Sequence, residues 1–392
     1  MRARTMVVLL LALLSAVSAR TQTYKTLYTF DGSPPYGSTP YAGLILDREG
    51  NFYGVTAYGG GGYYFDGALF KISPSAGDWT FNKVHEFEVS DPLGVEPIGG
   101  LALDDAGNVY GTTSYNEWEC GTIFRGNDPF LLHSFSGADG CVPQANLTYS
   151  NGRLWGTTTA GGSYGRGTVF TITTSGDDFR FYSFQGKNGA EPVGGINIWR
   201  YGVAKSGGSA NVGTIYWLDF SNRLVRKHSF KPDGRAGYAP VGDLLPQYAG
   251  TVRAMYGTTS AGGEGGGGTV YQVMESELKP KQWRIKVLHS FSGADGRMSL
   301  AGVTADQAGN LYGTTSRGGD WDCGTVFKLS PTKKHKWNFT VLYSFNPYNE
   351  DPGGNGCGPT SGVTLDASGN LYGTTLEGGF YGGLGTVYQI IP

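Results

Sequence analysis

A tandem repeat runs through this chain and limits its possible folds more than any other feature. The phrase LYGTT or a close relative occurs seven times, 45 to 60 residues apart. Its glycines are Gly54, Gly111, Gly156, Gly202, Gly257, Gly313 and Gly373. A phrase close to GTVF follows each copy, and a third phrase, typified by LHSF, also occurs seven times. A fixed period of this kind indicates that each unit buries its apolar surface against its neighbours.

Each repeated phrase has the composition of a β-strand. Thr, Val, Tyr and Phe alternate along it, and Gly, Asn and Asp stand at its ends. A fourth phrase, GGLALDDAGN at Gly99–Asn108, precedes most of the LYGTT copies. Four strands per repeat, seven times over, predict an all-β fold, a seven-bladed β-propeller of four-stranded antiparallel blades. We name the strands a (GGLALD), b (NLYGTT), c (GTVFKL) and d (VLHSF).

The order of the phrases predicts how the ring closes. The first strand is a lone d strand at Tyr24–Phe30, and the last repeat supplies a, b and c strands from about Thr360 to Ile391. If the N-terminal strand pairs with the last c strand, it completes the C-terminal blade and covers both open edges. The fourth repeat lacks the LDxxGN turn, so its a and b strands are the least well defined.

The first 19 residues have the pattern of a secretory signal peptide, with two arginines, an apolar run and small residues before Arg20. We therefore divide the chain into a signal peptide at 1–19 and a seven-repeat propeller at 20–392. Cleavage removes Arg2 and Arg4 and makes the formal net charge of −2 more negative by two. A mildly acidic protein has nothing that attracts nucleic acid or an anionic bilayer. We expect a secreted, extracellular or periplasmic monomer without a membrane span.

The repeat resembles the Gloeo/Verruco (GloVer) tandem repeat of exported bacterial proteins, whose signature is close to GNLYGTTSxGGxxxxGTVFKL. The copies at Asn310–Leu329 and Asn370–Gln389 match it specifically, and the match covers essentially the whole mature chain. The resemblance implies export, a tandem β architecture and, in many members of this choice-of-anchor type, an added C-terminal cell-surface anchor. It implies no established activity. The sequence departs from the anchored pattern by stopping at Pro392, which favours release from the cell.

Most residues with catalytic chemistry occupy repeat positions, which indicates a structural role. Four histidines share a slot of strand d in which other copies have tyrosine, namely His85, His133, His228 and His289. Four aspartates belong to the LDxxGN turn, namely Asp47, Asp104, Asp306 and Asp366. Asp is favoured there because its side chain bonds the local backbone. We therefore predict no catalytic residue, no metal and no cofactor.

The four cysteines also occupy repeat positions. Cys120 and Cys323 each stand immediately before the GT of a strand c, and Cys141 and Cys357 each lie in the loop after the next strand d. Of the three possible pairings, this equivalence selects Cys120 with Cys141 and Cys323 with Cys357. In an antiparallel blade the two loops emerge on one face, so both bridges are sterically reasonable.

The b-to-c loops vary most between copies and carry aromatic and acidic residues outside the repeat. Variable loops on a rigid scaffold are common binding sites, and aromatic rings beside carboxylates suit a sugar. The candidate ligand-binding residues are Trp118, Trp321, Tyr63, Tyr64, Tyr164, Tyr381, Glu117 and Asp320. Alternatively, Trp118 and Trp321 cover the neighbouring disulfides.

These observations favour an exported, non-catalytic binding propeller for extracellular polysaccharide or a cell-surface partner. One alternative is a glycan-acting hydrolase or lyase that uses loop carboxylates, either the pair Glu117 and Glu119 or the pair Asp320 and Asp322. Another is a structural scaffold in the envelope. Half-buried carboxylates with a raised pKa on the loop face would favour the enzyme, and a flat exposed aromatic strip would favour the binder.

Overall fold

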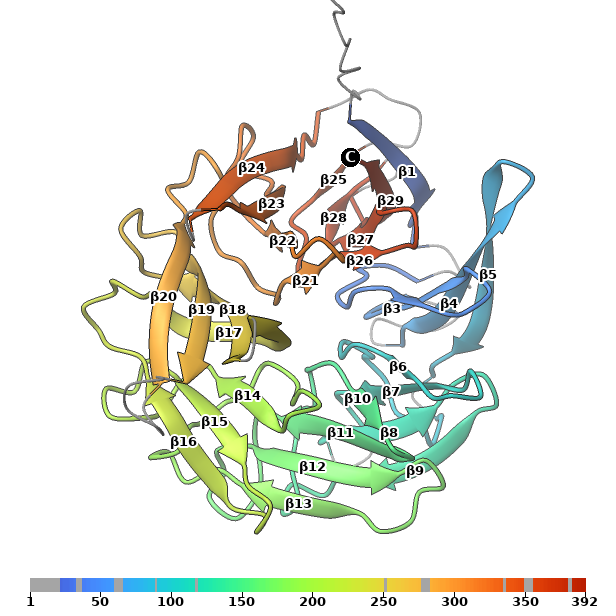
Figure 1. Cartoon of the computed structure of the whole chain (residues 1–392). Coiled ribbons are helices and arrows are strands. Elements are labelled where there is room, and N and C mark those ends of the chain that lie inside the picture. The colour runs from blue at the N-terminus through green and yellow to red at the C-terminus, as the bar shows by residue number, and fades with distance from the viewer. Residues whose placement is uncertain are drawn as a thin grey trace, which may run out of the picture.

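The fold is a closed ring of seven β-sheets around a central axis, seen along that axis in Figure 1. The computed structural model describes residues 22–32, 37–59, 66–88, 90–116, 119–249, 252–275, 283–333, 336–348, 355–379 and 383–392. All regular secondary structure in these ranges is β-strand, and they contain no helix that could span a membrane. The predicted seven-bladed propeller is confirmed.

The blades follow one another in chain order, and within each blade the strands run from the axis outward. Blade 1 contains β2 (Ile45–Leu46), β3 (Phe52–Thr56), β4 (Ala68–Ser75) and β5 (Asp78–Glu86). Blade 2 contains β6 (Ala102–Leu103), β7 (Val109–Thr113), β8 (Thr122–Arg125) and β9 (Phe130–Ser134). Blade 3 contains β10 (Thr148–Ser150), β11 (Arg153–Thr158), β12 (Thr168–Thr173) and β13 (Arg180–Ser183).

The remaining blades complete the ring. Blade 4 contains β14 (Tyr201–Ala204), β15 (Thr214–Leu218) and β16 (Leu224–Ser229). Blade 5 contains β17 (Tyr238–Ala249), β18 (Val252–Ala261), β19 (Thr269–Glu275) and β20 (Trp283–Ser290). Blade 6 contains β21 (Thr304–Ala305), β22 (Leu311–Thr315), β23 (Thr325–Pro331) and β24 (Trp337–Ser344). Blade 7 contains β26 (Thr364–Leu365), β27 (Leu371–Thr375), β29 (Thr386–Ile391) and β1 (Thr23–Thr29), and a separate pair joins β25 (Gly356–Cys357) to β28 (Glu377–Gly378).

The N-terminal strand closes the ring as predicted. β1 pairs antiparallel with β29, from Thr23 opposite Ile391 to Thr29 opposite Thr386. Figure 1 shows the blue N-terminal strand beside the red C-terminal blade. The outermost strand of blade 7 therefore comes from the opposite end of the chain.

The sheet of blade 4 has three strands, and residues 193–197 take the innermost position without forming a regular strand. The backbone N–H of Gly195 donates to the carboxylate of Asp243 in blade 5, 2.5 Å away. The segment is two residues shorter than in blade 2, where Ala102 and Leu103 of the inner strand precede the turn residue Asp104, because the turn residue Asn197 directly follows Ile196. This irregular segment explains why the sequence did not define the inner strands of the fourth repeat.

The glycine of LYGTT is explained by the aromatic residue opposite it on strand c. In every blade this glycine is the register partner of a Phe or Tyr, as Gly156 is of Phe170. A Cβ on Gly156 would lie 2.4 Å from Cζ of Phe170, so the ring occupies the space of the missing side chain. The same arrangement recurs in all seven blades, with closest distances of 2.3 to 2.6 Å. The two phrases therefore repeat together because they form one packing unit.

The histidine slot of strand d packs one blade against the next. The ring of His133 stacks on Phe179 with centroids 3.7 Å apart, and the ring of His289 stacks on Phe339 with centroids 3.6 Å apart. Three of these histidines also lie 2.6 to 2.8 Å from an aspartate carboxylate six residues further along. The predicted packing role of this slot is confirmed.

The LDxxGN turns are held by their own aspartates, as predicted. Oδ1 of Asp104 accepts the backbone N–H groups of Ala106 and Asn108 at 2.9 and 2.8 Å, and Oδ2 accepts the Asn108 amide and the Tyr110 hydroxyl. Burial opposes ionisation of Asp104, but these donors outweigh it and lower the pKa of the carboxyl. Within the described ranges no cluster of three His, Cys, Asp or Glu residues could hold a metal ion.

The two faces of the ring differ in the connections that they carry. The loop face holds the b-to-c and d-to-a connections, for example 159–167 and 135–147. The turn face holds the a-to-b and c-to-d turns, for example 104–108 and 126–129. Because the strands of each blade are antiparallel, these two sets of connections lie at opposite ends of the strands.

Candidate functional site in the axial cavity

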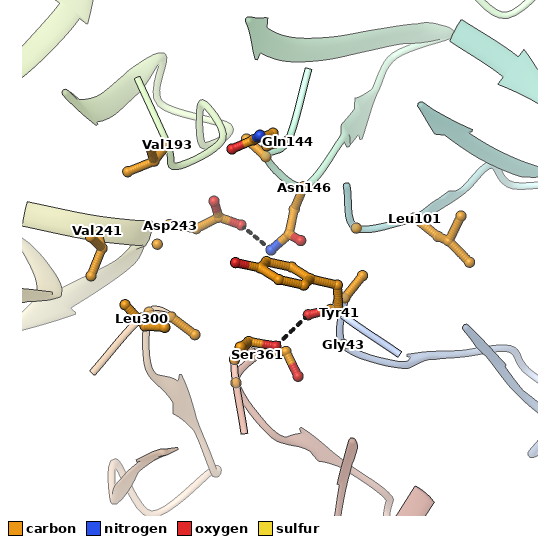
Figure 2. Close-up of a pocket in the computed structure, with 18 of the residues that line it drawn as sticks. Tyr41, Gly43, Leu101, Gln144, Asn146, Val193, Val241, Asp243, Leu300 and Ser361 are labelled. Carbon is orange, nitrogen blue, oxygen red and sulfur yellow. Dashed lines mark hydrogen bonds between the residues drawn. The ribbon is translucent and has the colours of Figure 1, made fainter. Parts of the chain in front are cut away.

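A cavity of about 470 Å³ lies on the ring axis, at the ends of the inner strands that adjoin the loop face. Residues from all seven blades line it, and Figure 2 shows labelled lining residues on different sides of the cavity, with the Tyr41 ring near its centre. Most of them precede the inner strands or begin them, for example Gln144 to Leu147 just before β10. The cavity is therefore built from the d-to-a connections.

Two rings of equivalent repeat positions form the cavity wall. The first ring has one variable residue from each blade, namely Tyr41, Ile98, Gln144, Val193, Val241, Leu300 and Thr360. The second ring lies two residues further along each connection and consists of Gly43, Gly100, Asn146, Gly195, Asp243, Gly302 and Gly362. Five of its seven positions are glycine. Asn146 and Asp243 are the two departures from the repeat in this ring.

The two departures contact each other across the axis. The side-chain amide of Asn146 in blade 3 donates to Oδ2 of Asp243 in blade 5 at 2.8 Å (Figure 2). The N–H of Gly195, from the intervening blade 4, donates to Oδ1 at 2.5 Å. Blades 3 and 5 are not neighbours, and their side chains meet in front of the intervening blade 4 because the inner ends of the blades converge on the axis.

Glycine at the other positions leaves room for this pair. A Cβ on Gly100 would lie 1.7 Å from Oδ1 of Asn146. Such a contact is far inside van der Waals distance, so a larger residue in blade 2 would displace the Asn146 side chain. The second ring is thus shaped around a single amide–carboxylate pair.

The Asp243 carboxyl is half-buried and faces the cavity, enclosed by the blades around it. Burial raises its pKa, and the hydrogen bonds from Asn146 and Gly195 only partly offset this effect. Among the described residues no Arg or Lys forms a salt bridge with it. Lys205 is the other charged residue of the cavity lining. Asp243 can therefore accept hydrogen bonds from a ligand, and in its protonated form it can donate one.

Tyr41 supplies the aromatic surface of the site. Its side chain is 42 % exposed, and in Figure 2 the ring points into the cavity with its hydroxyl on the side of Asp243 and Asn146. Its backbone carbonyl accepts a hydrogen bond from the Thr360 hydroxyl at 2.8 Å, which ties blade 1 to blade 7. The ring is held where a flat apolar group could stack on it.

In each d-to-a connection, the residue two positions before the first-ring residue has a left-handed backbone conformation, with a positive φ. The φ angles of these residues lie between 50° and 65°, although six of the seven are not glycine. They are Thr39, Glu96, Val142, Glu191, Ala239, Met298 and Gly358. Such backbone persists only where its surroundings enforce it. The first ring is therefore presented on a fixed backbone, and its side chains are free to differ between blades.

The structure places the candidate loop residues on the loop face but outside the cavity lining. Trp321 is 50 % exposed and touches the edge of Tyr348, with ring centroids 5.9 Å apart. Tyr164 and Asp320 are also exposed. The other candidates, Tyr63, Tyr64, Glu117, Trp118 and Tyr381, lie outside the described residues.

Among the loop carboxylates considered for catalysis, Asp322 has structural partners. Asp322 forms a bidentate ion pair with Arg297, at 3.2 and 2.9 Å, and accepts the N–H of Gly318. The Arg297 guanidinium holds the pKa of Asp322 below its ordinary value. Asp322 is therefore not suited to act as a general acid.

Both predicted disulfides are present at the rim of the site. They join Cys120 to Cys141 and Cys323 to Cys357, with Cα atoms 4.2 and 4.6 Å apart. Each ties a b-to-c loop to the d-to-a connection that follows it, directly before a left-handed residue. The bridges therefore fix the cavity wall of blades 3 and 7.

The residues of the axial cavity were not among those predicted from the sequence. The signal that could have found them is present in strand a, where GGL or a close relative becomes ANL in the third repeat and GDL in the fifth. Aligning these seven short phrases would have marked Asn146 and Asp243 as departures. It would not have shown that the two side chains meet, because they come from blades that are not neighbours.

A comparison with known protein families agrees with the repeat. A model of the Gloeobacter/Verrucomicrobia repeat matches residues 13–158, 121–277 and 249–392. A comparison with curated proteins finds no match. Similar solved structures include an α-L-arabinanase of Penicillium chrysogenum complexed with arabinobiose (10 % identity, 94 % of this chain and 97 % of that chain, TM-score 0.45). A putative oxidoreductase (glucose dehydrogenase) of Thermus thermophilus is also similar (14 % identity, 94 % and 100 %, TM-score 0.48). These similarities assign no activity to this chain.

Proposed function

The chain belongs to the Gloeobacter/Verrucomicrobia repeat family, and from the geometry of its axial cavity we propose that it is an exported glycan-binding propeller. The axial cavity takes a sugar residue of an extracellular polysaccharide. The observation that carries the proposal is the amide–carboxylate pair of Asn146 and Asp243, which replaces two glycines of the repeat in the wall of the cavity.

The composition of the cavity supports a sugar ligand. Its volume of about 470 Å³ lies within the range of small-molecule sites. A carboxylate and a side-chain amide offer acceptors and donors to vicinal hydroxyl groups, and the Tyr41 ring offers an apolar face. The rest of the first ring is largely aliphatic, which suits the C–H faces of a sugar.

Exposed aromatics on the loop face support a polymeric ligand. Trp321, Tyr348 and Tyr164 are at least half exposed, and Trp321 and Tyr348 touch each other. A chain that enters the axial cavity with one residue could place its neighbouring residues on these rings. The two disulfides are compatible with the oxidising compartments in which such a ligand occurs.

A glycan-acting enzyme is the second candidate, because the pKa of Asp243 is raised by burial. A carboxyl whose pKa is raised is better suited to act as a general acid. Hydrolysis of a glycosidic bond commonly needs a second carboxylate across the bond, and Asp243 is the single carboxylate among the residues that line the cavity. The geometry therefore supports binding better than hydrolysis.

The proposal is tested by screening the mature protein on an array of bacterial and plant polysaccharides. Asp243→Gly restores the residue that five other blades have at this position, so we expect the variant to fold and to lose its array signal. Trp321→Ala is the companion variant, and we expect a weaker signal only with polymers. A folded wild type that binds no glycan, or an Asp243→Gly variant that binds like wild type, contradicts the proposal.

The polysaccharide found on the array also distinguishes a glycan-acting enzyme from a binding protein. The polysaccharide that binds is incubated with the wild-type protein for a day, and its chain-length distribution is compared with a protein-free control. We expect no change in the distribution. If wild type shortens the polysaccharide and the Asp243→Asn variant does not, the protein is an enzyme.

A further inference from the structure

A second cavity, of about 230 Å³, lies between blades 3 and 4 on the turn face. Its lining includes Arg153 and Trp155 of β11 and Asn197 and Arg200 of blade 4. It adjoins the innermost segment of blade 4, which forms no regular strand. The irregularity of the fourth repeat therefore coincides with a second concave site.

The a-to-b turn of blade 4 keeps the repeat geometry with different residues. Oδ1 of Asn197 accepts the N–H groups of Trp199 and Tyr201, both at 3.0 Å, as the aspartate of the other turns does. Arg200 then occupies the position of the turn glycine, with φ at 66°. The glycines at this position in blades 1, 2, 6 and 7 have φ between 81° and 88°. A long charged residue thus stands where the backbone conformation favours glycine.

Arg200 is a half-buried cation that forms no salt bridge, although the carboxylate of Asp219, which pairs with Arg223, attracts it from a longer distance. Its guanidinium lies over the rings of Trp155 and Phe220, 5.1 and 5.7 Å from their centroids. Nη2 donates to Oδ1 of Asn222 at 2.9 Å, and the buried Nε has no hydrogen-bond partner. Within the described part of the chain, no carboxylate lies within ion-pair distance of it. Burial of this charge lowers its pKa. An anion at this position would restore the balance of charge.

The neighbouring Arg153 is not available to bind an anion. Arg153 donates to the carboxylate of Asp178 at 2.8 Å and to its backbone carbonyl at the same distance. Its Nε donates to the Thr171 hydroxyl. Arg153 is therefore satisfied within blade 3, and Arg200 is left to recognise a ligand.

Exposed apolar groups stand beside the unpaired guanidinium. Phe220 is 83 % exposed and Ile198 is 61 % exposed. Phe220 follows strand β15 in the c-to-d turn of the same blade, and its ring contacts Trp217 edge-on. An open aromatic face next to a guanidinium suits a ligand that has a sugar ring and a carboxylate. Ser150 and Asn151 of the cavity lining supply partners for its hydroxyl groups.

We propose that this cavity is a second carbohydrate site, specific for an acidic sugar such as a hexuronate residue. The sugar carboxylate pairs with the guanidinium of Arg200, and the sugar ring packs on Phe220. The site is on the turn face, at the opposite end of the strands from the loop face, and the proposal does not depend on the function proposed for the axial cavity.

The test uses calorimetric titration with trigalacturonate, its fully methyl-esterified form and neutral trigalactose. Arg200→Gly installs the residue that the other turns have at this φ, so the variant should fold with an unchanged or higher thermal midpoint. We expect wild type to bind trigalacturonate at least tenfold more tightly than either uncharged trimer. In Arg200→Gly this preference should disappear.

Two further variants make the outcome decisive. Phe220→Ala removes an exposed ring and should weaken trigalacturonate binding several-fold without affecting folding. Asp243→Gly, in the axial cavity, should leave trigalacturonate binding unchanged. The proposal is overturned if wild type does not distinguish the acid from its ester, or if Arg200→Gly binds the acid like wild type. It is also overturned if Asp243→Gly, and not Arg200→Gly, abolishes binding, because the acid would then occupy the axial cavity.

Discussion

At the scale of single residues, differences between the seven repeats at one position distinguish residues that pack the core from residues with a candidate function. Strand c has Phe opposite the LYGTT glycine in four blades and Tyr in the other three, namely Tyr216, Tyr271 and Tyr388. The three hydroxyls are buried and have no hydrogen-bond partner. These hydroxyl groups thus form no contact that explains the exchange of Phe for Tyr. Asn146 and Asp243 of the axial cavity differ, because their side chains bond to each other.

We predict that Tyr271→Phe increases the free energy of unfolding by about 1 kcal/mol, because it removes a buried hydroxyl that lacks a partner. Tyr312→Phe is the matched control. Its hydroxyl donates to Asp306 at 3.0 Å, so its removal should decrease stability by about 1 kcal/mol. Urea unfolding measures both changes. A loss of stability in Tyr271→Phe would mean that its hydroxyl is satisfied in solution.

A second residue-scale prediction concerns pH. Burial lowers the pKa of His133 and His289, which outweighs the effect of their aspartate partners. Near and below the ordinary histidine pKa of about 6.5 the unfolded chain therefore binds more protons than the folded one. The free energy of unfolding should fall as the pH decreases from about 7.5 to about 5.5.

The matched variant for this pH effect replaces both histidines with tyrosine, the residue that Tyr28, Tyr182 and Tyr343 supply in the same slot. The double variant should lose less stability than wild type over this pH interval. Urea midpoints at the two pH values measure the difference. Equal losses in both proteins would assign the acid sensitivity to other groups.

At the scale of elements, each blade is unified by the contact between strands b and c. Gly156→Ala would place a methyl group 2.4 Å from the ring of Phe170. Overpacking of this kind typically costs about 1–3 kcal/mol, and we predict a loss of stability in that range. Phe170→Leu relieves the crowding, so it should cost less when combined with Gly156→Ala than it does in wild type. Additive effects in this double-mutant cycle would contradict the proposed contact.

The strands, the ring closure and both disulfides were predictable from the sequence, because each recurs or has an equivalent in another repeat, as Cys120 and Cys323 do. The axial pair was not predicted, because strand a is the least regular phrase. The contact of Asn146 with Asp243 also joins two repeats that are not consecutive, so no single repeat shows it. Arg200 was missed because the fourth repeat has no LDxxGN turn to compare.

At the scale of the whole molecule, the ring depends on its first strand. β1 supplies the outer strand of blade 7, and Tyr24 packs between Tyr343 of blade 6 and Tyr388 of its own blade. We predict that a protein lacking Tyr24–Phe30 is unfolded or aggregated when expressed for export. Size-exclusion chromatography and circular dichroism measure this outcome, and a monomeric, folded truncation would contradict it. The control is a protein that lacks residues 1–20 only and therefore keeps strand β1.

The antiparallel strands of the blades also give the molecule two distinct faces around one axis. The loop face carries the axial cavity, and the turn face carries the site at Arg200. Both sites occur where the sequence departs from its repeat, and the departures do not serve the core. The seven blades thus form a frame, and we propose that a few non-repeating side chains determine what it binds.

The most direct test of the axial site is a calorimetric titration of the glycan selected by the array against wild type and the Asn146→Gly/Asp243→Gly double variant. The variant replaces both departures with the glycine of the other blades, and its thermal midpoint is measured first to establish folding. Hydrogen bonds to a charged group contribute about 1.5–3 kcal/mol. Their loss should therefore raise the Kd of the double variant at least tenfold above that of wild type. An unchanged Kd in a folded variant would contradict the assignment of the axial cavity as the binding site.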